Sequence, residues 1–128
     1  SIIGHGLANR FPDLKFMPTE YASGWIRPFV DKLKRTYEKS PVMFDEDPFE
    51  RFKSSVYIHM FHEPDPQGLL DIGLRADHLM FGSDFPHPEG MADPLAYSEV
   101  VEDMPAEDQQ LIMGGTMARL MGFDSAAA

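Results

Sequence analysis

The sequence predicts an α/β fold in which parallel strands alternate with helices. Three short segments, 14–20, 54–61 and 77–84, are predicted as strands, and helical apolar spacing separates and follows them. The last segment has a nearly continuous apolar centre, which is typical of a parallel strand buried on both faces. Such alternation indicates βαβ units with right-handed crossovers, which place the helices on one side of the sheet.

The first predicted strand, 14–20, follows a proline turn and ends in the carboxylate of Glu20. Pro18 weakens this strand, because proline removes a hydrogen-bond donor from the ladder. The first helix is predicted over 25–38, with Pro28 in its first turn, where a missing N–H does no harm. One apolar stripe carries this helix prediction: Ile26, Phe29, Val30, Leu33 and Tyr37.

The second predicted strand, 54–61, is rich in β-branched and aromatic residues. An acidic loop flanked by proline is expected before it. That loop covers 40–48. A short amphipathic helix is predicted at 67–74, and further helices are predicted at 94–103 and 106–121. Gly114 and Gly115 interrupt the last helix, because glycine is a poor helix former.

The length of 128 residues predicts about one domain. A closed parallel barrel needs about eight strands, and an open sheet of three would leave one face bare. The chain is therefore expected to associate with more chain or to be a fragment. It begins at Ser1 without methionine, which fits a fragment, a truncated product or a cloning choice.

Composition excludes several classes of protein. Lys and Arg number 11 against 21 Asp and Glu, a net charge of -10, so no basic nucleic-acid surface is expected. There is no cysteine, so a metal must be held by histidine and carboxylates. No apolar run reaches the roughly 20 residues that a membrane helix needs, and no signal peptide is evident. These features predict a soluble, cytoplasmic protein.

The candidate site residues lie where predicted strands end. Glu20 and Asp84 close two strands, and His59 lies near the end of the third. In parallel barrels the active site is formed at these ends, where carboxylates and imidazole can bind a divalent ion at about 2.0–2.2 Å. Asp84 is the strongest candidate, since a charge directly after Leu79-Met80-Phe81 is costly unless it is paired or ligated. The alternative is an Asp that caps a turn or the next helix.

The segment Gly82-Ser83-Asp84-Phe85-Pro86-His87-Pro88-Glu89-Gly90 resembles the signature of the amidohydrolase-2 family. That family includes relatives of aminocarboxymuconate-semialdehyde decarboxylase and resorcylate decarboxylase. Other stretches agree in order along the chain: 10–15, 20–25, 70–73, 112–115 and 118–122. The signature is fairly specific, whereas the other stretches are individually weak.

The resemblance implies a TIM-like (β/α)8 barrel with one divalent metal, zinc first and manganese or iron as alternatives. Residues 1–128 would form a single partial barrel domain that is incomplete at its N-terminal side, and would supply about strands six to eight with their helices. Asp84 would be the metal ligand or proton-transfer group. Glu20 stands where many members have histidine on strand six, so it could hold substrate, bind metal or be structural. His87 could contact substrate or hold the Asp84 loop, or simply be a hydrogen-bonded loop residue.

Two departures from the family pattern concern the metal site. The His-x-His of the first strand and the histidine of the fifth strand are absent, and both would lie upstream of Ser1. The metal site is therefore expected to be incomplete, and metal binding by this chain weak. For the remaining histidines a ligand role is unsupported. His59 and His62 are expected to be solvated or core-edge residues, and His5 and His78 surface or strand-edge residues. Trp25 could line the pocket mouth or belong to the core.

The resemblance implies a metal-dependent hydrolase or nonoxidative decarboxylase that acts on a small carboxylate or aromatic compound, with the reaction type open. The alternative is a truncated, inactive partial barrel stabilised by self-association as a homo-oligomer. A split enzyme, completed by a separate N-terminal half of the barrel, lies between the two. No membrane or nucleic-acid partner is expected.

Overall fold

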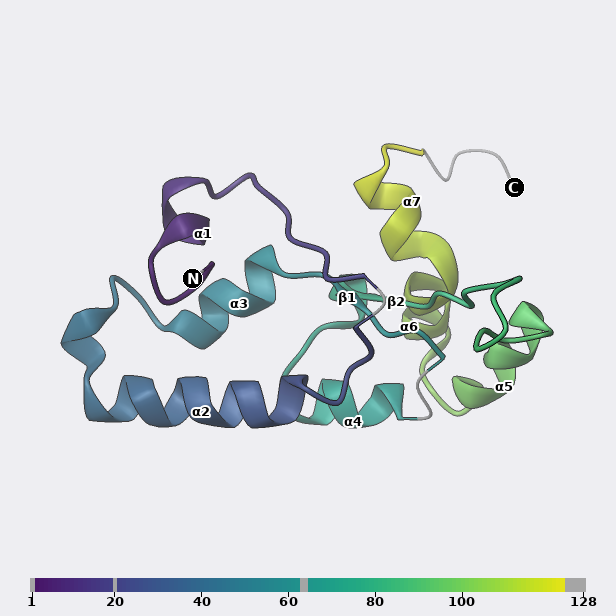
Figure 1. The fold of residues 1–128 in the computed structure, drawn as a ribbon, viewed down its shortest axis with the longest axis horizontal. Helices are drawn as coiled ribbons and strands as arrows, with labels where there is room; N and C mark the ends of the chain where they lie inside the picture. Colours follow the sequence, from purple (N-terminus) through teal and green to yellow (C-terminus); the bar gives the residue numbers. More distant parts are fainter. Residues whose placement is uncertain (1, 20, 63–64, 124–128) are drawn as a thin grey trace.

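The structure is a computed structural model that describes residues 2–19, 21–62 and 65–123. A small parallel sheet lies near the middle of an elongated molecule, between a half that contains α1, α2 and α3 and a half that contains α5, α6 and α7 (Figure 1). The α-helices are α1 (Leu7–Arg10), α2 (Ile26–Lys39), α3 (Pro48–Ser55), α4 (Pro66–Asp71), α5 (Tyr97–Val100), α6 (Ala106–Gln110) and α7 (Thr116–Leu120). The other helical turns are η1 (Pro41–Met43), η2 (Ala76–His78), η3 (Pro94–Ala96) and the π-helical turn η4 (Leu111–Gly115).

The sheet is parallel, as predicted, but its strands are short. β1 (Ile58–His59) pairs with β2 (Leu79–Met80) in parallel. A third segment joins through a parallel bridge between Phe16 and Val56. The three segments therefore lie side by side in chain order, which is the arrangement that consecutive βαβ units produce.

The predicted strand boundaries are wrong at several ends. Ser54 and Ser55 belong to α3, and the start of the 77–84 segment is helical as η2. α3 was not predicted, and η1 lies inside the expected acidic loop. A local cap explains α3: the side chain of Asp47 accepts a hydrogen bond of 2.8 Å from the Phe49 N–H. Such a cap satisfies one of the free donors at the start of a helix.

The predicted long helix is confirmed as α2, with bounds shifted by one residue. Ile26, Val30 and Leu33 form its buried stripe. Burial of each such side chain stabilises the fold by about 1.5–3 kcal/mol. Pro28 lies in the first turn, where the helix does not need its N–H.

The C-terminal half is built from short helices. α4 begins at Pro66, after Asp65 accepts a hydrogen bond of 2.8 Å from the Gly68 N–H. The predicted helix 94–103 is shorter than expected and is formed by η3 and α5. The predicted helix 106–121 is confirmed together with its interruption, because the backbone at Gly114 departs from helical geometry between α6 and α7.

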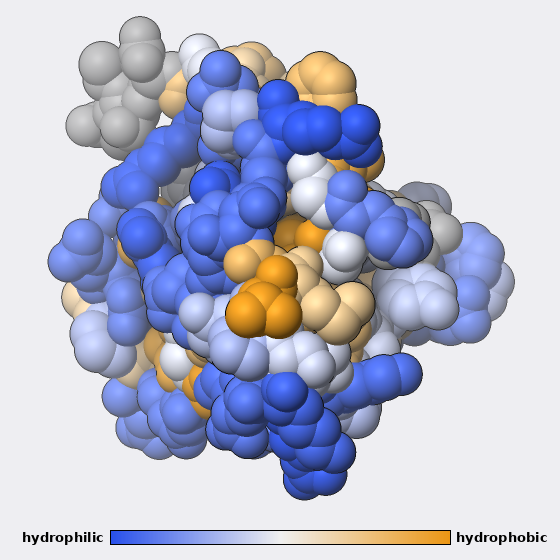
Figure 2. All heavy atoms as spheres, turned by 90° about the vertical axis from the view of Figure 1, so that its left-hand side faces the viewer, coloured by the Kyte–Doolittle hydropathy of each residue, from blue (hydrophilic) through white to orange (hydrophobic). Residues whose placement is uncertain are grey.

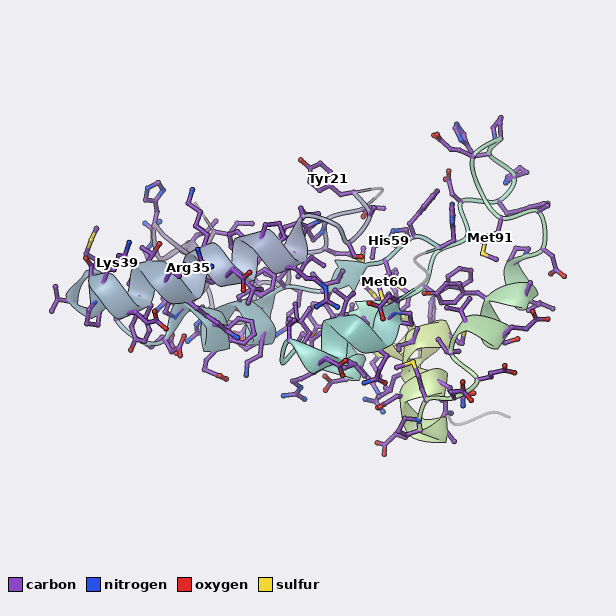
Figure 3. The ribbon with its side chains drawn as sticks, turned by 90° about the horizontal axis from the view of Figure 1, so that it is seen from below. Tyr21, Arg35, Lys39, His59, Met60 and Met91 are labelled. Atoms are coloured by element: carbon purple, nitrogen blue, oxygen red, sulfur yellow. The ribbon has the colours of Figure 1, made fainter. Side chains whose placement is uncertain are left out.

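The register of the sheet separates two faces. In a parallel pair, residues opposite each other point to the same side. Ile58 lies opposite Leu79, and both belong to the buried apolar core. His59 lies opposite Met80 and points to the other face. Figure 3 shows His59 and Met60 projecting from opposite sides of β1.

The helix-facing side of the sheet continues into the C-terminal half. Phe81 stacks on Tyr97 with ring centroids 4.2 Å apart and an angle of 8° between the rings. The Phe81 N–H also donates to the Ile112 carbonyl at 3.0 Å. These contacts anchor the end of β2 on α5 and η4, so the segment that follows leaves the sheet from a fixed point.

In the described part of the chain, no helix combines the length and the apolar character that crossing a membrane requires.

Candidate active site at the strand tips

Asp84 lies just beyond β2, where the chain leaves the sheet. Its backbone has φ 55°, a left-handed conformation that residues other than glycine rarely adopt. Its side chain is 22% exposed, and its Oδ2 lies 3.4 Å from His87 Nδ1. The structure therefore brings together two of the predicted site residues, and their chemical roles stay predictions.

Main-chain hydrogen bonds close the segment after β2 into a tight loop. The N–H of His87 donates to the Asp84 carbonyl at 2.7 Å, that of Gly90 to the His87 carbonyl at 2.9 Å, and that of Met91 to the Ser83 carbonyl at 2.8 Å. A Cβ at Gly90 would lie 2.5 Å from the Asp84 carbonyl oxygen. The loop therefore closes in this form only with glycine at that position.

An open pocket of about 440 Å³ lies in front of Asp84. Three chain segments supply its wall: the one after the Phe16 bridge, the one after β1 and the one after β2. The lining residues are Tyr21, Ala22, Phe61, Asp84, His87 and Glu89. The tips of all three parallel segments thus meet at one place, as expected at the carboxyl ends of parallel strands.

Backbone strain gathers at the same pocket. Ala22 has φ 50°, Phe61 has φ 56° and Asp84 has φ 55°, and within the described residues these are the positions other than glycine with positive φ. Each lies at the tip of a different segment, and all three line the pocket. Such conformations cost of order 1–3 kcal/mol each and cluster at functional sites. The pocket therefore has a backbone signature of a functional site that does not depend on its side chains.

The comparisons with known proteins point the same way. The family model described as Amidohydrolase matches residues 2–123. The chain belongs to the amidohydrolase family. It is also similar to the crystal structure of an amidohydrolase from Mycobacterium avium subsp. paratuberculosis K-10, with a TM-score of 0.86 and 31% sequence identity. That similarity covers 94% of this chain and 31% of that chain, so this chain spans about a third of the relative's length. No curated protein matches this chain.

The family has a TIM-barrel fold, and the short parallel sheet with its helices agrees with part of such a barrel. The family is also generally metal-dependent. One donor atom each from Asp84, His87 and Glu89 lie within 4.8 Å of one another. Carboxylate oxygen and imidazole nitrogen suit zinc, manganese or iron.

The fit of these residues to a metal is partial. All three donors come from one loop, and the side chains of His87 and Glu89 are 57% and 77% exposed. Asp84, at 22%, is the donor that the fold holds most firmly. Among the described residues, these three donors therefore form an open cluster on one loop.

Glu20, the second predicted catalytic residue, lies outside the described residues. Its neighbour Tyr21 lines the pocket and is 68% exposed.

His59 and His78 do not reach the pocket. The ring of His59 fills the space beside Gly82, where a Cβ would lie 1.8 Å from Nε2. Its Nδ1 is buried without a hydrogen-bond partner in the described part of the protein. His78 stacks on Tyr57 with ring centroids 4.3 Å apart, and with a side chain 12% exposed it is mostly buried just before β2.

Sequence reasoning missed the aromatic residues that line this pocket. Tyr21 and Phe61 were not predicted as site residues, because an aromatic residue at a strand end is typical of a core position. Glu89, which belongs to the signature segment, also lines the pocket and was not predicted as a site residue. A positive φ at Ala22 or Phe61 leaves no sequence signal, since neither residue is one that favours this conformation.

Trp25 does not line the pocket at the strand tips and packs against the apolar core, which is the second of the two expectations for it. Its Nε1 donates to the Ala22 carbonyl at 3.1 Å, so it supports one strained tip from outside. Its ring contacts those of Phe29 and Phe52 in edge arrangements, with centroids 5.8 Å and 6.3 Å apart. These three residues belong to the wall of a largely apolar groove of about 640 Å³ between α2, α3 and the start of the chain.

Apolar surface is also exposed at the end of the molecule that carries η1. Val42 is 94% exposed and Met43 is 74% exposed. Figure 2 shows, from this end, apolar side chains gathered within a mostly hydrophilic surface. This surface and the apolar groove are features that a larger assembly of chain would cover.

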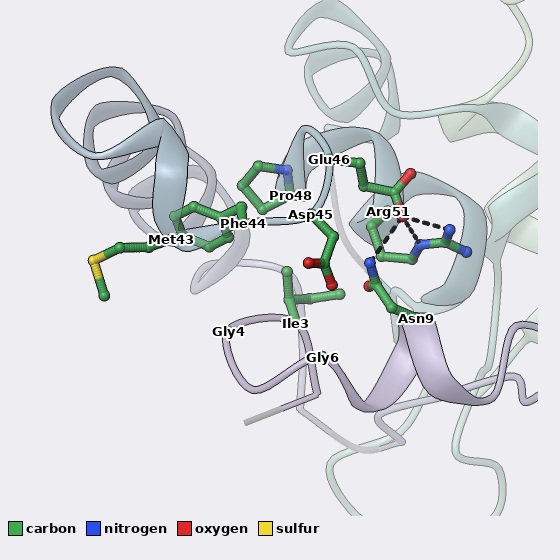
Figure 4. Close-up of a pocket in the computed structure, with 10 residues that line it drawn as sticks. All are labelled: Ile3, Gly4, Gly6, Asn9, Met43, Phe44, Asp45, Glu46, Pro48 and Arg51. Carbon is green, nitrogen blue, oxygen red and sulfur yellow. Dashed lines mark hydrogen bonds and ion pairs between the residues drawn. The ribbon is translucent and has the colours of Figure 1, made fainter.

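A small cavity of about 40 Å³ near α1 is a structural contact rather than a second site (Figure 4). Oε1 of Glu46 accepts hydrogen bonds from Asn9 Nδ2 at 3.0 Å and from Arg51 Nε at 2.7 Å. The carboxylate is thereby satisfied, and it joins α1 to α3.

Proposed function

We propose that this chain forms about strands six to eight, with their helices, of an amidohydrolase barrel and supplies part of a metal-dependent active site. The intact protein would be a hydrolase or nonoxidative decarboxylase for a small carboxylate or aromatic compound. The observation that carries the proposal is the meeting of three strained strand tips, Ala22, Phe61 and Asp84, around one pocket.

Asp84 is the residue on which the chemistry depends. Its carboxylate is partly buried at the pocket and lies at ion-pair distance from the His87 imidazole. It can act as a ligand, or it can hold a proton at an oxygen that faces the reacting group. His87 holds the Asp84 side chain in place and is exposed enough to contact substrate. Glu20 is proposed as a further carboxylate for substrate or metal.

Asp84, with His87 and Glu89 beside it, would hold a divalent ion of the zinc, manganese or iron type. When bound, such an ion supplies Lewis-acid polarisation of substrate oxygen or of water. The contribution of this chain is to place Asp84 on a closed loop and to line the opposite side of the pocket with Tyr21 and Phe61. Those aromatic side chains offer flat apolar surfaces to a planar substrate.

A chimera tests this proposal directly. The corresponding third of the Mycobacterium avium amidohydrolase is replaced by residues 2–123 of this chain, and metal content is measured by elemental analysis. We expect about one divalent ion per chimera, and its loss in the Asp84→Asn variant. A chimera that folds and retains its metal in the Asp84→Asn variant would remove Asp84 from the metal site.

The apolar groove supports a second candidate, a partial barrel that associates with itself. A monomer with the groove lined by Phe16, Trp25 and Phe29 leaves a large apolar surface in water. Sedimentation velocity of the 128-residue chain separates the two candidates. A dimer or larger homo-oligomer without bound metal favours self-association, and a monomer that accepts the missing part of the barrel favours the enzyme.

A further inference from the structure

A single side chain joins the tip of β1 to the loop that carries Asp84. His62 Nε2 lies 3.2 Å from the carbonyl oxygen of Glu89, 27 residues further along the chain. A carbonyl oxygen only accepts, so the imidazole donates and its proton is on Nε2. This tautomer follows from the contact, because the assignment of ring protons rests on their partners.

The same imidazole packs against the pocket wall. The ring centroids of His62 and Phe61 lie 4.2 Å apart at an angle of 41°. Phe61 lines the pocket and has a strained backbone, with φ 56°. His62 therefore stands between the aromatic wall on one side and the loop of Asp84 and Glu89 on the other.

The other hydrogen bonds of the Asp84 loop join residues within the loop itself. In the described residues they run from the N–H of His87 to the Asp84 carbonyl, from that of Gly90 to the His87 carbonyl, from that of Met91 to the Ser83 carbonyl, and from that of Phe85 to Ser83 Oγ. Within residues 2–19, 21–62 and 65–123, the bond from His62 is the one hydrogen bond that ties this loop to another strand tip. Internal bonds set the shape of the loop, and the His62 bond sets its position relative to the opposite wall.

We propose that His62 is a positioning residue that holds the Asp84 loop against the tip of β1 and so sets the width of the pocket. It acts through the main chain of Glu89, with no contact of its own to substrate. The inference concerns the site of the proposed function, but the clamp is a property of the loop, and it can be tested without catalysis.

The experiment compares His62→Ala, which removes the donor, with His62→Gln, which keeps an N–H at a similar reach. His5→Ala is the control, because His5 is an exposed histidine near the start of the chain. Amide hydrogen exchange is followed by NMR in the full 128-residue chain at His87, Gly90 and Met91. Binding of Zn²⁺ alone is measured by calorimetry on the same samples.

We expect His62→Ala to speed exchange at the three loop amides by about three- to tenfold, the loss of one hydrogen bond. Exchange at Ile58 and Leu79 in the sheet is expected to stay unchanged. His62→Gln and His5→Ala should behave as the wild type. Zn²⁺ affinity, where the wild type binds, should fall about tenfold in His62→Ala and recover in His62→Gln, as for residues that orient ligands.

Two results would overturn the clamp. One is unchanged loop exchange in His62→Ala, and the other is equal acceleration of loop and sheet amides, which would give His62 a general structural role. Weak or absent Zn²⁺ binding by the wild-type chain is what an incomplete metal site predicts, so in that case the exchange data alone decide the clamp.

Discussion

Asp84 Oδ2 lies 3.4 Å from His87 Nδ1, on a loop that main-chain hydrogen bonds close behind them. The pair places an anionic oxygen and an imidazole nitrogen at the mouth of one pocket, with Tyr21 and Phe61 on the other walls. This is the arrangement from which the proposed chemistry of the site follows.

The Asp84→Asn variant is expected to lower Zn²⁺ affinity at least tenfold, because an amide oxygen lacks the charge that a hard divalent ion prefers. Isothermal calorimetry on the 128-residue chain measures the Zn²⁺ affinity. Low salt is used because the site is open and salt screens exposed charges. Asp13→Asn is a matched control, since Asp13 is exposed and outside the pocket. Equal losses in both variants would mean that Zn²⁺ responds only to the net charge of -10.

Gly82→Ala is expected to destabilise the protein by about 1–3 kcal/mol, as overpacked substitutions do. The new Cβ would lie 1.8 Å from His59 Nε2, so the imidazole must move. The free energy of unfolding is measured by urea denaturation. In the Gly82→Ala/His59→Ala double variant the ring is gone, so the cost of Gly82→Ala should largely disappear. Additive effects would show that the two residues do not compete for this space.

Acid is expected to weaken a cluster at the start of β2. Burial disfavours the charge of Asp77, but hydrogen bonds from Arg75 and His78 outweigh this effect, so its pKa lies below the ordinary value of 3.8. A carboxyl with a lowered folded-state pKa contributes stability above its unfolded-state pKa and loses it as pH falls through the folded-state pKa. The free energy of unfolding should therefore decline as pH falls below about 4.

Asp77→Asn is the variant that isolates this effect. It should reduce stability at pH 7 and flatten the decline below about pH 4, because the titrating group is gone. Urea denaturation at a series of pH values provides the measurement. Asp103→Asn, at an exposed position, serves for comparison. A decline that is as steep in Asp77→Asn as in the wild type would assign the acid sensitivity to other carboxylates.

The single tryptophan reports on the apolar groove. Trp25 is the one Trp of the chain and lines that groove beside Phe29. If a second copy covers the groove, water leaves the indole of Trp25. The fluorescence emission of Trp25 should then shift to shorter wavelength as protein concentration rises. The shift should be accompanied by a larger sedimentation coefficient. Emission that is constant over a hundredfold range of concentration, with a monomeric sedimentation coefficient, would count against self-association.

Local patterns predicted α2 and the interruption at Gly114 well. The apolar spacing of α2 and the place of Pro28 depend on neighbours three or four residues away, so they can be read along the chain. The same locality misled the prediction over 54–61. Ser54 and Ser55 directly precede a β-branched and aromatic run, so they were included in the predicted strand. In the structure they form the last residues of α3, whose N-terminus is capped by Asp47.

The candidate site also has features that the sequence predicted and features that only the tertiary structure shows. The sequence alone determined which chemistry the chain can offer: carboxylates and imidazole without thiolate, with Asp84 and His87 in one short motif. Only the tertiary structure decided that Tyr21, Ala22 and Phe61 meet Asp84, and that His62 reaches Glu89. Those contacts depend on the register of parallel segments that lie far apart in the chain, and no periodicity within a segment records that register.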